Sequence, residues 1–408
     1  NKKGKVLILC NRSELVDQSA ETLTKIGLTY EKITPKTRRV HHAADVYICM
    51  VETLYRRLLS NPKYLTDVSL IIADECHYMS FPKIYSFFPK SKILGVTATP
   101  ILLGRDTFYK CDRCNSASDE LGDCCGREMM EWTKPKKLSD TYEDIVVGPS
   151  IDYLIEMGQL VREINFIKQT SDLSRLQIDR SGDFSNKSQD AVFGDADSIF
   201  NVLLNYEQIA KGKRTVIFNN STKTNIKVYE DFKKAGHPVK MYDSVNATDE
   251  TRQEIVKWFK NTEGAILCNV ATFIAGFDAR NIECIILNVA TMSLAKYLQA
   301  VGRGGRSCSE IYKPNFIVID SANNLERFGN WSDPTRDWRK IFFEGIGKEK
   351  AKQERPLSVQ ECQSCSMLFT RSESVCPNCG CKVSIPPPRD KVLGDEILAP
   401  IDKIPLPN

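Results

Sequence analysis

Short apolar segments that end in charged or hydroxyl-bearing residues dominate the first hundred positions. Residues 68–73 (VSLIIA) run directly into Asp74, and residues 92–96 (KILGV) run directly into Thr97. Helical patterns separate such segments, and strands that alternate with helices predict a parallel sheet covered on both faces. A second set of apolar segments begins near residue 215. We therefore expect an α/β fold with two parallel-sheet lobes.

Composition narrows the class of protein. The 408 residues predict two to four domains, at about 100–200 residues per domain. Lys and Arg total 56 and Asp and Glu total 52, so the net charge of +4 excludes a heavily basic nucleic-acid coat but allows a local basic groove. No apolar run is long enough to span a bilayer, and no signal peptide opens the chain. We expect a cytoplasmic protein without membrane contacts.

Residues 74–77 (Asp-Glu-Cys-His) form the strongest local motif, directly after a buried strand. In parallel sheets, the carboxyl ends of the strands line the ligand crevice. One carboxylate there can hold Mg²⁺, which bridges nucleotide phosphates, and the next can polarise an attacking water. The competing interpretation is a pair of acids that caps the following helix. Thr97 and Thr99 follow the next strand and could hydrogen-bond this turn, although Thr-Pro turns are common at strand ends.

Residues 299–306 (QAVGRGGR) form a second candidate site. Gln299, Arg303 and Arg306 lie at i, i+4 and i+7, which is one face of a helix that extends that far. Two arginines on one face suit a polyphosphate. Three glycines in this segment are costly inside a helix, so they predict a helix end. A solvated basic helix end is therefore the alternative interpretation.

The order of the motifs is more specific than any one of them. The chain contains LCNRSELVDQ, VETLYRRL, ADECH, GVTATP, VIFNNST, NVATFIAGFD and QAVGRGGR in that order. This order resembles motifs Ia, Ic, II, III, IV, V and VI of the superfamily-two helicases and translocases, over residues 5–330. The segments YEDIVVGPSIDYLIEMGQLV and IVIDSANNLERFGNW look like the bacterial and phage DEAD/DEAH-type (DExH) helicases related to RadD, a DNA-repair protein. The resemblance implies two RecA-like lobes, with ATP and Mg²⁺ as cofactors.

By this resemblance, Asp74 is the Mg²⁺-associated acid and Glu75 is the catalytic base. The other expected catalytic or nucleotide-binding residues are His77, Gly276, Asp278, Gln299, Arg303 and Arg306. Thr97 and Thr99 are expected to couple the nucleotide state to the nucleic-acid path. The residues expected along the nucleic-acid backbone are Arg12, Gln18, Asn219, Ser221 and Thr222. Backbone contacts would make binding independent of sequence and strongly dependent on salt.

One motif of the family is missing from these 408 residues. The phosphate-cradling loop GxGK[ST], which supplies a lysine to the phosphates and a hydroxyl to Mg²⁺, should precede motif Ia. Gly4-Lys5 lacks the rest of that loop, and Gly212-Lys213 lies in the wrong place. The chain also begins with Asn1 and not with Met. We therefore expect a first lobe that is truncated at its N-terminus and a chain that alone does not hydrolyse ATP.

Fifteen cysteines are many for a cytoplasmic chain, so clustered cysteines predict metal sites. The pairs Cys362-x2-Cys365 and Cys376-x2-Cys379 are separated by ten residues, which fits Zn²⁺ held by four thiolates.

A second cysteine cluster lies between the two α/β sets. Its members are Cys111, Cys114, Cys124 and Cys125. Adjacent cysteines rarely both reach one metal without backbone distortion, so this cluster is the weaker prediction of a Zn²⁺ site. RadD-like proteins carry a cysteine-rich insert of this kind, which supports the prediction by analogy.

These expectations define a domain plan and a function. The plan comprises a first lobe at 1–107, a cysteine-rich insert at 108–140, a second lobe at 141–350, a four-cysteine zinc ribbon at 355–385 and a Pro-rich tail at 386–408. The expected function is an ATP-dependent helicase or translocase on single-stranded or branched DNA, in repair, recombination or replication. An ATPase-deficient nucleic-acid-binding module and an RNA helicase are the alternatives. The zinc modules and the Pro-rich tail are the candidate contacts for a protein partner.

Overall fold

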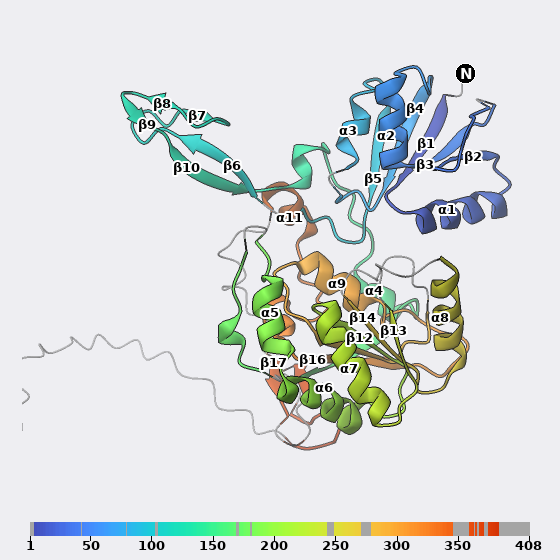
Figure 1. The fold of residues 1–408 in the computed structure, drawn as a ribbon, viewed down its shortest axis with the longest axis vertical. Coiled ribbons are helices and arrows are strands. Elements are labelled where there is room, and N and C mark those ends of the chain that lie inside the picture. Colours follow the sequence, from blue (N-terminus) through green and yellow to red (C-terminus); the bar gives the residue numbers. More distant parts are fainter. Residues whose placement is uncertain are drawn as a thin grey trace, which may run out of the picture.

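Two α/β lobes and a long antiparallel arm make up the molecule (Figure 1). The computed structural model describes residues 4–41, 43–78, 80–102, 105–168, 171–179, 182–242, 249–270, 279–345, 359–362, 364, 367–370 and 374–382. Gly276, Asp278, Cys365 and the Pro-rich tail lie outside the described residues. Within the described part of the chain, no helix combines the length and apolar character that crossing a membrane requires.

The first lobe is a five-stranded parallel sheet between helices. Its strands run in the order β2-β3-β1-β4-β5. Side chains alternate across the central strand, so Leu7 and Leu9 pack under α2 while Cys10 packs under α1. The elements are β1 (Lys5–Cys10), α1 (Ser13–Lys25), β2 (Tyr30–Ile33), β3 (Val46–Met50), α2 (Val51–Ser60), β4 (Val68–Asp74), α3 (Pro82–Tyr85) and β5 (Lys92–Val96).

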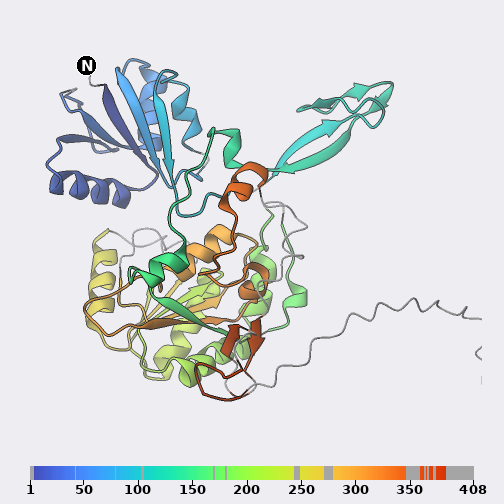
Figure 2. The ribbon, with the colours of Figure 1, turned by 180° about the vertical axis from the view of Figure 1, so that it is seen from behind.

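The second lobe has an eight-stranded sheet in the order β13-β14-β12-β15-β16-β11-β18-β17. The strands from β13 to β11 are parallel, whereas β17 and β18 are antiparallel additions at one edge (Figure 2). The two parallel sheets confirm the expected α/β class. The strands are β11 (Arg162–Ile167), β12 (Thr215–Asn219), β13 (Val239–Tyr242), β14 (Ile266–Val270), β15 (Cys284–Asn288), β16 (Asn315–Asp320), β17 (Val359–Glu361) and β18 (Met367–Thr370).

Helices cover both faces of the second sheet, as a buried parallel sheet requires. The α-helices are α4 (Ile151–Glu156), α5 (Asn186–Phe193), α6 (Ala196–Ile209), α7 (Thr222–Lys234), α8 (Asp249–Asn261), α9 (Leu294–Gly302), α10 (Asn324–Phe328) and α11 (Trp338–Glu344). Two short 3₁₀ helices, η1 (Leu138–Asp140) and η2 (Leu173–Arg175), lie in the connections.

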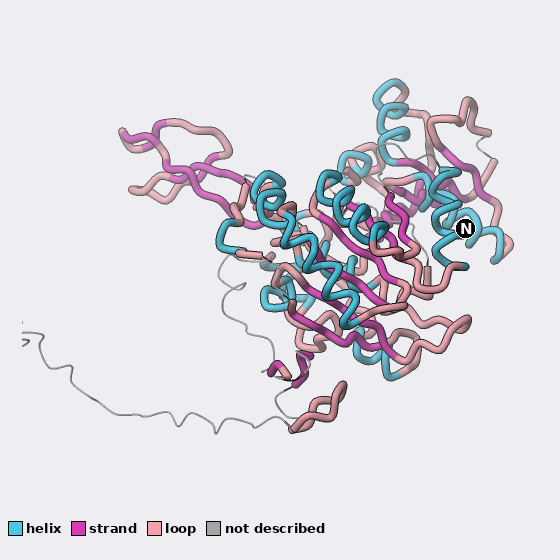
Figure 3. The backbone as a smooth tube through the Cα atoms, turned by 60° about the horizontal axis from the view of Figure 1, so that its bottom comes forward, coloured by secondary structure: helices cyan, strands magenta, loops and turns pink. Residues whose placement is uncertain are grey.

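A twisted antiparallel arm projects from the junction of the lobes (Figure 3). Its main sheet has the order β10-β6-β7, and a second ribbon pairs β8 with β9. The strands are β6 (Arg105–Lys110), β7 (Ala117–Ser118), β8 (Asp123–Cys124), β9 (Arg127–Glu128) and β10 (Met130–Pro135). The chain then returns to the first lobe, where the hydroxyls of Tyr142 and Tyr85 lie 2.7 Å apart. The expected domain boundaries at 107 and 140 stay a prediction.

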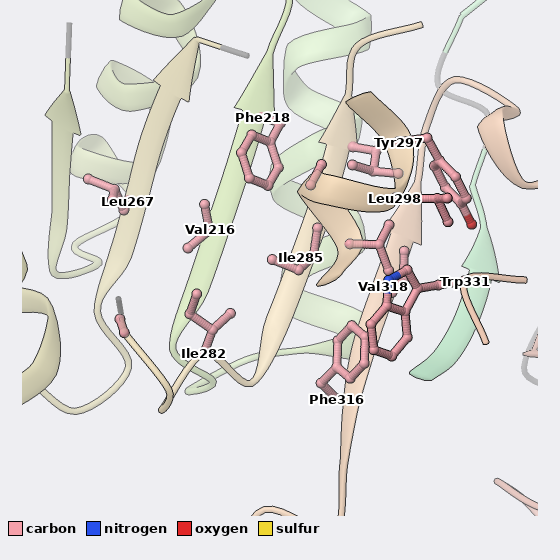
Figure 4. Packing of buried hydrophobic residues seen from close by; sticks show 14 of the residues in the cluster. Val216, Phe218, Leu267, Ile282, Ile285, Tyr297, Leu298, Phe316, Val318 and Trp331 are labelled. Atoms are coloured by element: carbon pink, nitrogen blue, oxygen red, sulfur yellow. The ribbon is translucent and has the colours of Figure 1, made fainter. Parts of the chain in front are cut away.

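The end of α9 is packed unusually tightly against aromatic rings of the second lobe (Figure 4). Phe316 and Trp331 meet edge to face, with ring centroids 5.9 Å apart. A Cβ added at Gly304 would lie 2.2 Å from the Phe316 ring, and one added at Gly305 would lie 2.2 Å from the Trp331 ring. These glycines are therefore required by close packing and not by a left-handed backbone.

We expect the substitution Gly305→Ala to lower the free energy of unfolding of the second lobe by about 1–3 kcal/mol, because the added methyl overpacks the Trp331 contact. Urea unfolding followed by tryptophan fluorescence measures this change. Gly148→Ala is the matched control, since no heavy atom lies within 4 Å of its added Cβ, and it should change stability by less than about 0.5 kcal/mol. Equal effects of the two substitutions would contradict the packing argument.

Candidate functional site

The turn that follows β4 holds the two expected acidic residues at the carboxyl end of the sheet. Asp74 is the last residue of β4, and Glu75 has a left-handed backbone with φ of 54°. The Cys76 amide N–H donates to the Val96 carbonyl oxygen at 3.0 Å, which ties the turn to the end of β5. Strained non-glycine residues of this kind cluster at functional sites. The structure thus places the DECH motif at the carboxyl end of β4, as the strand pattern predicts.

The Thr97 hydroxyl connects the residues of this turn. It lies 2.9 Å from Nδ1 of His77 and donates to the Glu75 carboxylate at 3.4 Å. The Thr99 backbone N–H donates back to the same hydroxyl at 3.1 Å. Thr97 therefore links Glu75 and His77 to Thr99, the residue that faces the second lobe.

Burial changes the proton affinity of the titratable groups in the turn. It raises the pKa of Asp74, and burial together with the neighbouring Asp74 raises the pKa of Glu75. The positive charges of Arg303 and Arg12 oppose the shift in the pKa of Glu75. Two partly desolvated carboxylates favour a cation beside them, so the donor set at Asp74 fits Mg²⁺. Burial also lowers the pKa of His77 to about 4, which keeps its imidazole neutral near pH 7.

The second lobe presents its motif to this turn from the end of α9. Gln299 Nε2 donates to the Thr99 hydroxyl across the lobes at 3.4 Å. α9 ends at Gly302, and Arg303 is its C-cap residue, as the glycines predicted. Arg306 lies beyond the helix and pairs with Leu160 in an isolated bridge. A longer helix would place Gln299, Arg303 and Arg306 on one face. That face is not formed, because α9 ends at Gly302, where the closely packed glycines begin.

A buried lysine that the sequence did not single out supports this segment. Lys313 Nζ donates to the carbonyl oxygens of Arg306 and Arg280, each at 2.9 Å. Burial lowers the pKa of Lys313 to about 8. The Val161 N–H donates to the Gly305 carbonyl at 2.8 Å from the other side. Only the three-dimensional approach of these loop segments reveals the role of Lys313, since nothing in the sequence around Lys313 marks it.

Asn219 lies at the carboxyl end of β12 and is completely buried. Its amide nitrogen donates to Asn225, and its amide oxygen accepts from Asn288, both at 2.8 Å. This differs from the expected contact with a nucleic-acid backbone, because the core of the lobe uses both ends of the side chain. Asn219 instead joins β12, β15 and α7.

Ser221 and Thr222 lie at the start of α7, next to Asn219. The Ser221 hydroxyl caps α7 by accepting from the Thr224 N–H, and it also donates to Asp190 at 2.5 Å. Beside them, a cavity of about 250 Å³ opens at the carboxyl ends of β12 and β15, lined in part by Asn220, Asp183 and Lys296. Ser221 and Thr222 are half-buried at the rim of this edge, so their expected role stays a prediction.

Arg12 and Gln18 belong to α1 and its N-cap, at the carboxyl edge of the first sheet. Gln18 is exposed, whereas Arg12 is half-buried and close enough to Glu75 to affect its pKa. The structure therefore places Arg12 nearer to the acidic turn than the sequence suggested.

The four cysteines of the arm form one cluster. Their sulfur atoms all lie within 4.8 Å of one another. Cys125 has φ of 54° and Gly126 has φ of 76°, and this left-handed turn lets adjacent Cys124 and Cys125 face the same point. Hydrogen bonds from Ser116 lower the pKa of Cys114 to about 6, whereas the neighbouring thiols raise the pKa of Cys125 to about 12, so Cys114 is the first of the two to form the thiolate that binds metal. The donor set and its spacing fit a tetrahedral Zn²⁺ site.

The C-terminal cluster packs against the edge of the second lobe. The sulfurs of Cys362, Cys376 and Cys379 lie within 4.8 Å of one another, and Cys365 lies outside the described residues. The Gly380 N–H donates to the Cys376 carbonyl at 2.9 Å, which closes a tight knuckle. Cys362 and Cys376 are buried together with Phe166 of β11. Three thiols in this arrangement fit part of the predicted four-cysteine site.

Two family models match the chain. Residues 1–102 match "Type III restriction enzyme, res subunit", and residues 196–308 match "Helicase conserved C-terminal domain". A 51.5 kDa protein of a Lactococcus phage is 27% identical over 406 residues, which is 98% of this chain and 77% of that protein. A Saccharomyces cerevisiae protein with the name "Putative ATP-dependent helicase IRC3" is 28% identical over 310 residues, or 74% of this chain and 41% of that protein.

Solved structures share the fold. A fragment of an HsdR subunit of a type I restriction enzyme from Vibrio vulnificus superposes with a TM-score of 0.53 at 17% identity. It matches 85% of this chain and 56% of that one, so the chain spans about half of its length. The type ISP restriction-modification enzyme LlaBIII gives a TM-score of 0.52 at 13% identity, over 86% of this chain and 26% of that one.

Two RecA-like lobes with a DExH turn between them define a helicase-type core. The motifs, the two matching family models and the related folds agree on this class. The chain belongs to the superfamily-two helicases of the DExH type.

We expect the folded protein to lose stability below about pH 6.5 in part through His77. The unfolded histidine takes up a proton near pH 6.5 and the folded one near pH 4, so the unfolded state binds more protons between these values. The free energy of unfolding should fall over this range by about 2 kcal/mol more in the wild type than in His77→Asn. Urea titrations at a series of pH values measure it. Parallel pH profiles for the two proteins would refute the buried neutral imidazole.

We predict two zinc ions per chain, one in each cysteine cluster. Cys114→Ser and Cys379→Ser should each remove one equivalent, because each deletes a thiolate from a separate site. Metal content of the purified proteins measures this. Cys308→Ser is the control, since Cys308 belongs to neither cluster, and it should retain both ions. Full zinc content in Cys114→Ser would exclude the arm site.

Proposed function

We propose that the chain is the core of an ATP-dependent nucleic-acid translocase or helicase, with ATP and Mg²⁺ between the lobes. The observation that carries the proposal is the pairing of opposed groups across the lobes. The positive charge of Arg303 in the second lobe opposes the rise in the pKa of Glu75 in the first lobe. Gln299 of the second lobe also donates a hydrogen bond to Thr99 of the first. ATP bound there would supply the phosphoryl group.

The residues of the turn have distinct roles in this proposal. Glu75, whose pKa is raised by burial, is suited to accept a proton from an attacking water. Arg303 supplies positive charge where negative charge develops on phosphate oxygens. Thr97 contacts both Glu75 and Thr99. A change at the acidic turn when nucleotide binds would therefore change the contact that Thr99 makes with the second lobe.

We propose DNA as the nucleic acid, in repair, recombination or replication. The support is the resemblance of residues 142–161 and 317–331 to the RadD-related helicases. An RNA substrate is the alternative, and competition between DNA and RNA strands of matched sequence separates the two. Binding mainly through the strand backbone predicts a strong dependence on salt for either substrate.

We expect the 408-residue chain alone not to hydrolyse ATP, because GxGK[ST] is absent from its sequence. ATP turnover is measured with and without single-stranded DNA, for this chain and for a version that includes any residues encoded upstream of Asn1. Where those residues supply the loop, we expect DNA-stimulated turnover. Glu75→Gln should reduce it at least about a hundredfold, since it removes the proton acceptor but keeps the shape.

Each other outcome has a definite meaning. Robust turnover by the 408-residue chain would contradict the requirement for the phosphate loop. A folded protein that carries the loop, binds strands and still shows no turnover would contradict the motor. The remaining candidate would then be an ATPase-deficient strand-binding module.

A further inference from the structure

One face of the arm combines aromatic and basic side chains. In the register of β6 and β10, Trp132 lies opposite Phe108, and Met130 lies opposite Lys110. Lys134 follows two residues after Trp132 and therefore projects from the same face. The Lys110 ammonium lies 5.6 Å from the centre of the Trp132 ring. We call Phe108, Lys110, Met130, Trp132 and Lys134 the arm face.

The large apolar side chains of the arm face are unusually exposed to solvent. Trp132 is 49% exposed and Met130 is 50% exposed. Of the four tryptophans, all within the described part of the chain, Trp132 is the one that is exposed, whereas the others are buried or half-buried. Trp132 and Met130 together form an exposed apolar patch on the arm, and such a patch indicates a contact surface.

We propose that the arm face binds an unpaired nucleic-acid strand outside the cleft between the lobes. Aromatic rings stack on any base, and lysines beside them pair with the phosphates, which is the combination that single-strand binding surfaces use. The inference rests on the proposed function only in the class of its ligand, because no arm residue is among the partners that the described part of the chain provides for Asp74–His77.

The charges on the arm favour a strand over a protein partner. Lys110 and Lys134 flank Trp132 along the face, at roughly the spacing of successive residues on one side of a strand. The acidic Asp106 at the base of the same face is paired with Lys136 at 3.5 Å. Glu131 projects from the opposite face, beside Tyr109. Apart from Asp106, which is paired with Lys136, the charged residues of β6 and β10 that share the face of Trp132 are therefore positive.

The segment that follows the arm is tied to the second lobe by α11. α11 lies beside η1, and Arg339 of α11 bonds to Asp144 at 2.7 Å and to the Ile145 carbonyl at 3.1 Å. From this base the arm points away from both lobes (Figures 1 and 2). A strand held there lies beyond the lobes, where it would leave or enter them.

Binding of a fluorescent oligothymidylate to the full chain tests the proposal by anisotropy. Trp132→Ala should weaken binding about five- to tenfold, whereas Trp132→Phe, which keeps a stacking ring, should stay within about twofold of the wild type. Tyr109→Ala is the matched control, an aromatic residue of the same hairpin on the opposite face, and should also stay within about twofold. Zinc content and circular dichroism of each variant report whether the arm is folded.

Salt provides a second, independent readout. The double substitution Lys110→Gln with Lys134→Gln should reduce the slope of log affinity against log salt by about 1.4, because each phosphate contact on a single strand contributes about 0.7. An oligouridylate run in parallel shows whether the arm face accepts RNA as well as DNA. An unchanged slope would overturn the proposed phosphate contacts.

The outcomes separate this inference from the proposed function. Wild-type binding that Trp132→Ala leaves unchanged would overturn the arm face alone. Absence of any strand binding by the wild-type chain would overturn both. Equal losses in Trp132→Ala and Tyr109→Ala would assign the effect to hairpin stability and overturn the face. A change of oligomeric state in Trp132→Ala without a change in strand binding would make the face a protein contact, which also overturns it.

Discussion

A continuous chain of hydrogen bonds across the lobes is the interaction on which the site depends. It runs from the Glu75 carboxylate through the Thr97 hydroxyl to Thr99, and from the Thr99 hydroxyl to Gln299. Parallel strands place all their carboxyl ends at one edge of a sheet, so an acidic turn after β4 and a threonine after β5 necessarily meet. The end of a single helix of the second lobe, α9, then lies near the acidic turn and the threonines together. At this site the hydrogen bond between the two lobes is thus made by the Thr99 hydroxyl.

Buried polar groups set the position of the second-lobe residues. Lys313 holds the backbone at Arg280 and Arg306, while Asn219 holds β12, β15 and α7 together. Each buried group joins one partner that is near in the sequence to one that is distant, Arg280 for Lys313 and Asn288 for Asn219. Removal of one member of such a pair would leave the other unpaired at a cost of about 1–3 kcal/mol. Such networks fix one arrangement of the loops more firmly than apolar packing alone. They explain why motif residues in this lobe serve the core as well as the cleft.

The alternation of apolar segments and helices predicted the lobes because each central strand is buried on both faces. Short edge strands such as β2 (YEKI) and β13 (VKMY) escaped prediction, since half-exposed strands of four residues carry no continuous apolar run. The arm strands escaped for a related reason, as they have no layer to bury and so no apolar period. The glycines of residues 302–305 predicted the end of α9, but their contact with Trp331 depends on a residue 26 positions away from Gly305. The role of Asn219 could not be predicted, because its partners lie on other elements.

The antiparallel strand β18 covers the outer edge of β11 and continues the sheet of the second lobe into the C-terminal cysteine cluster. An uncovered edge strand offers a row of unpaired backbone groups to other molecules. The cysteine cluster therefore lies beside the strand that covers the edge of β11. Its integrity bears on whether that edge stays closed to pairing with other protein chains. Loss of a metal held there would remove a cross-link beside β18, and the pairing of β18 is what keeps the backbone groups of β11 from pairing with another chain.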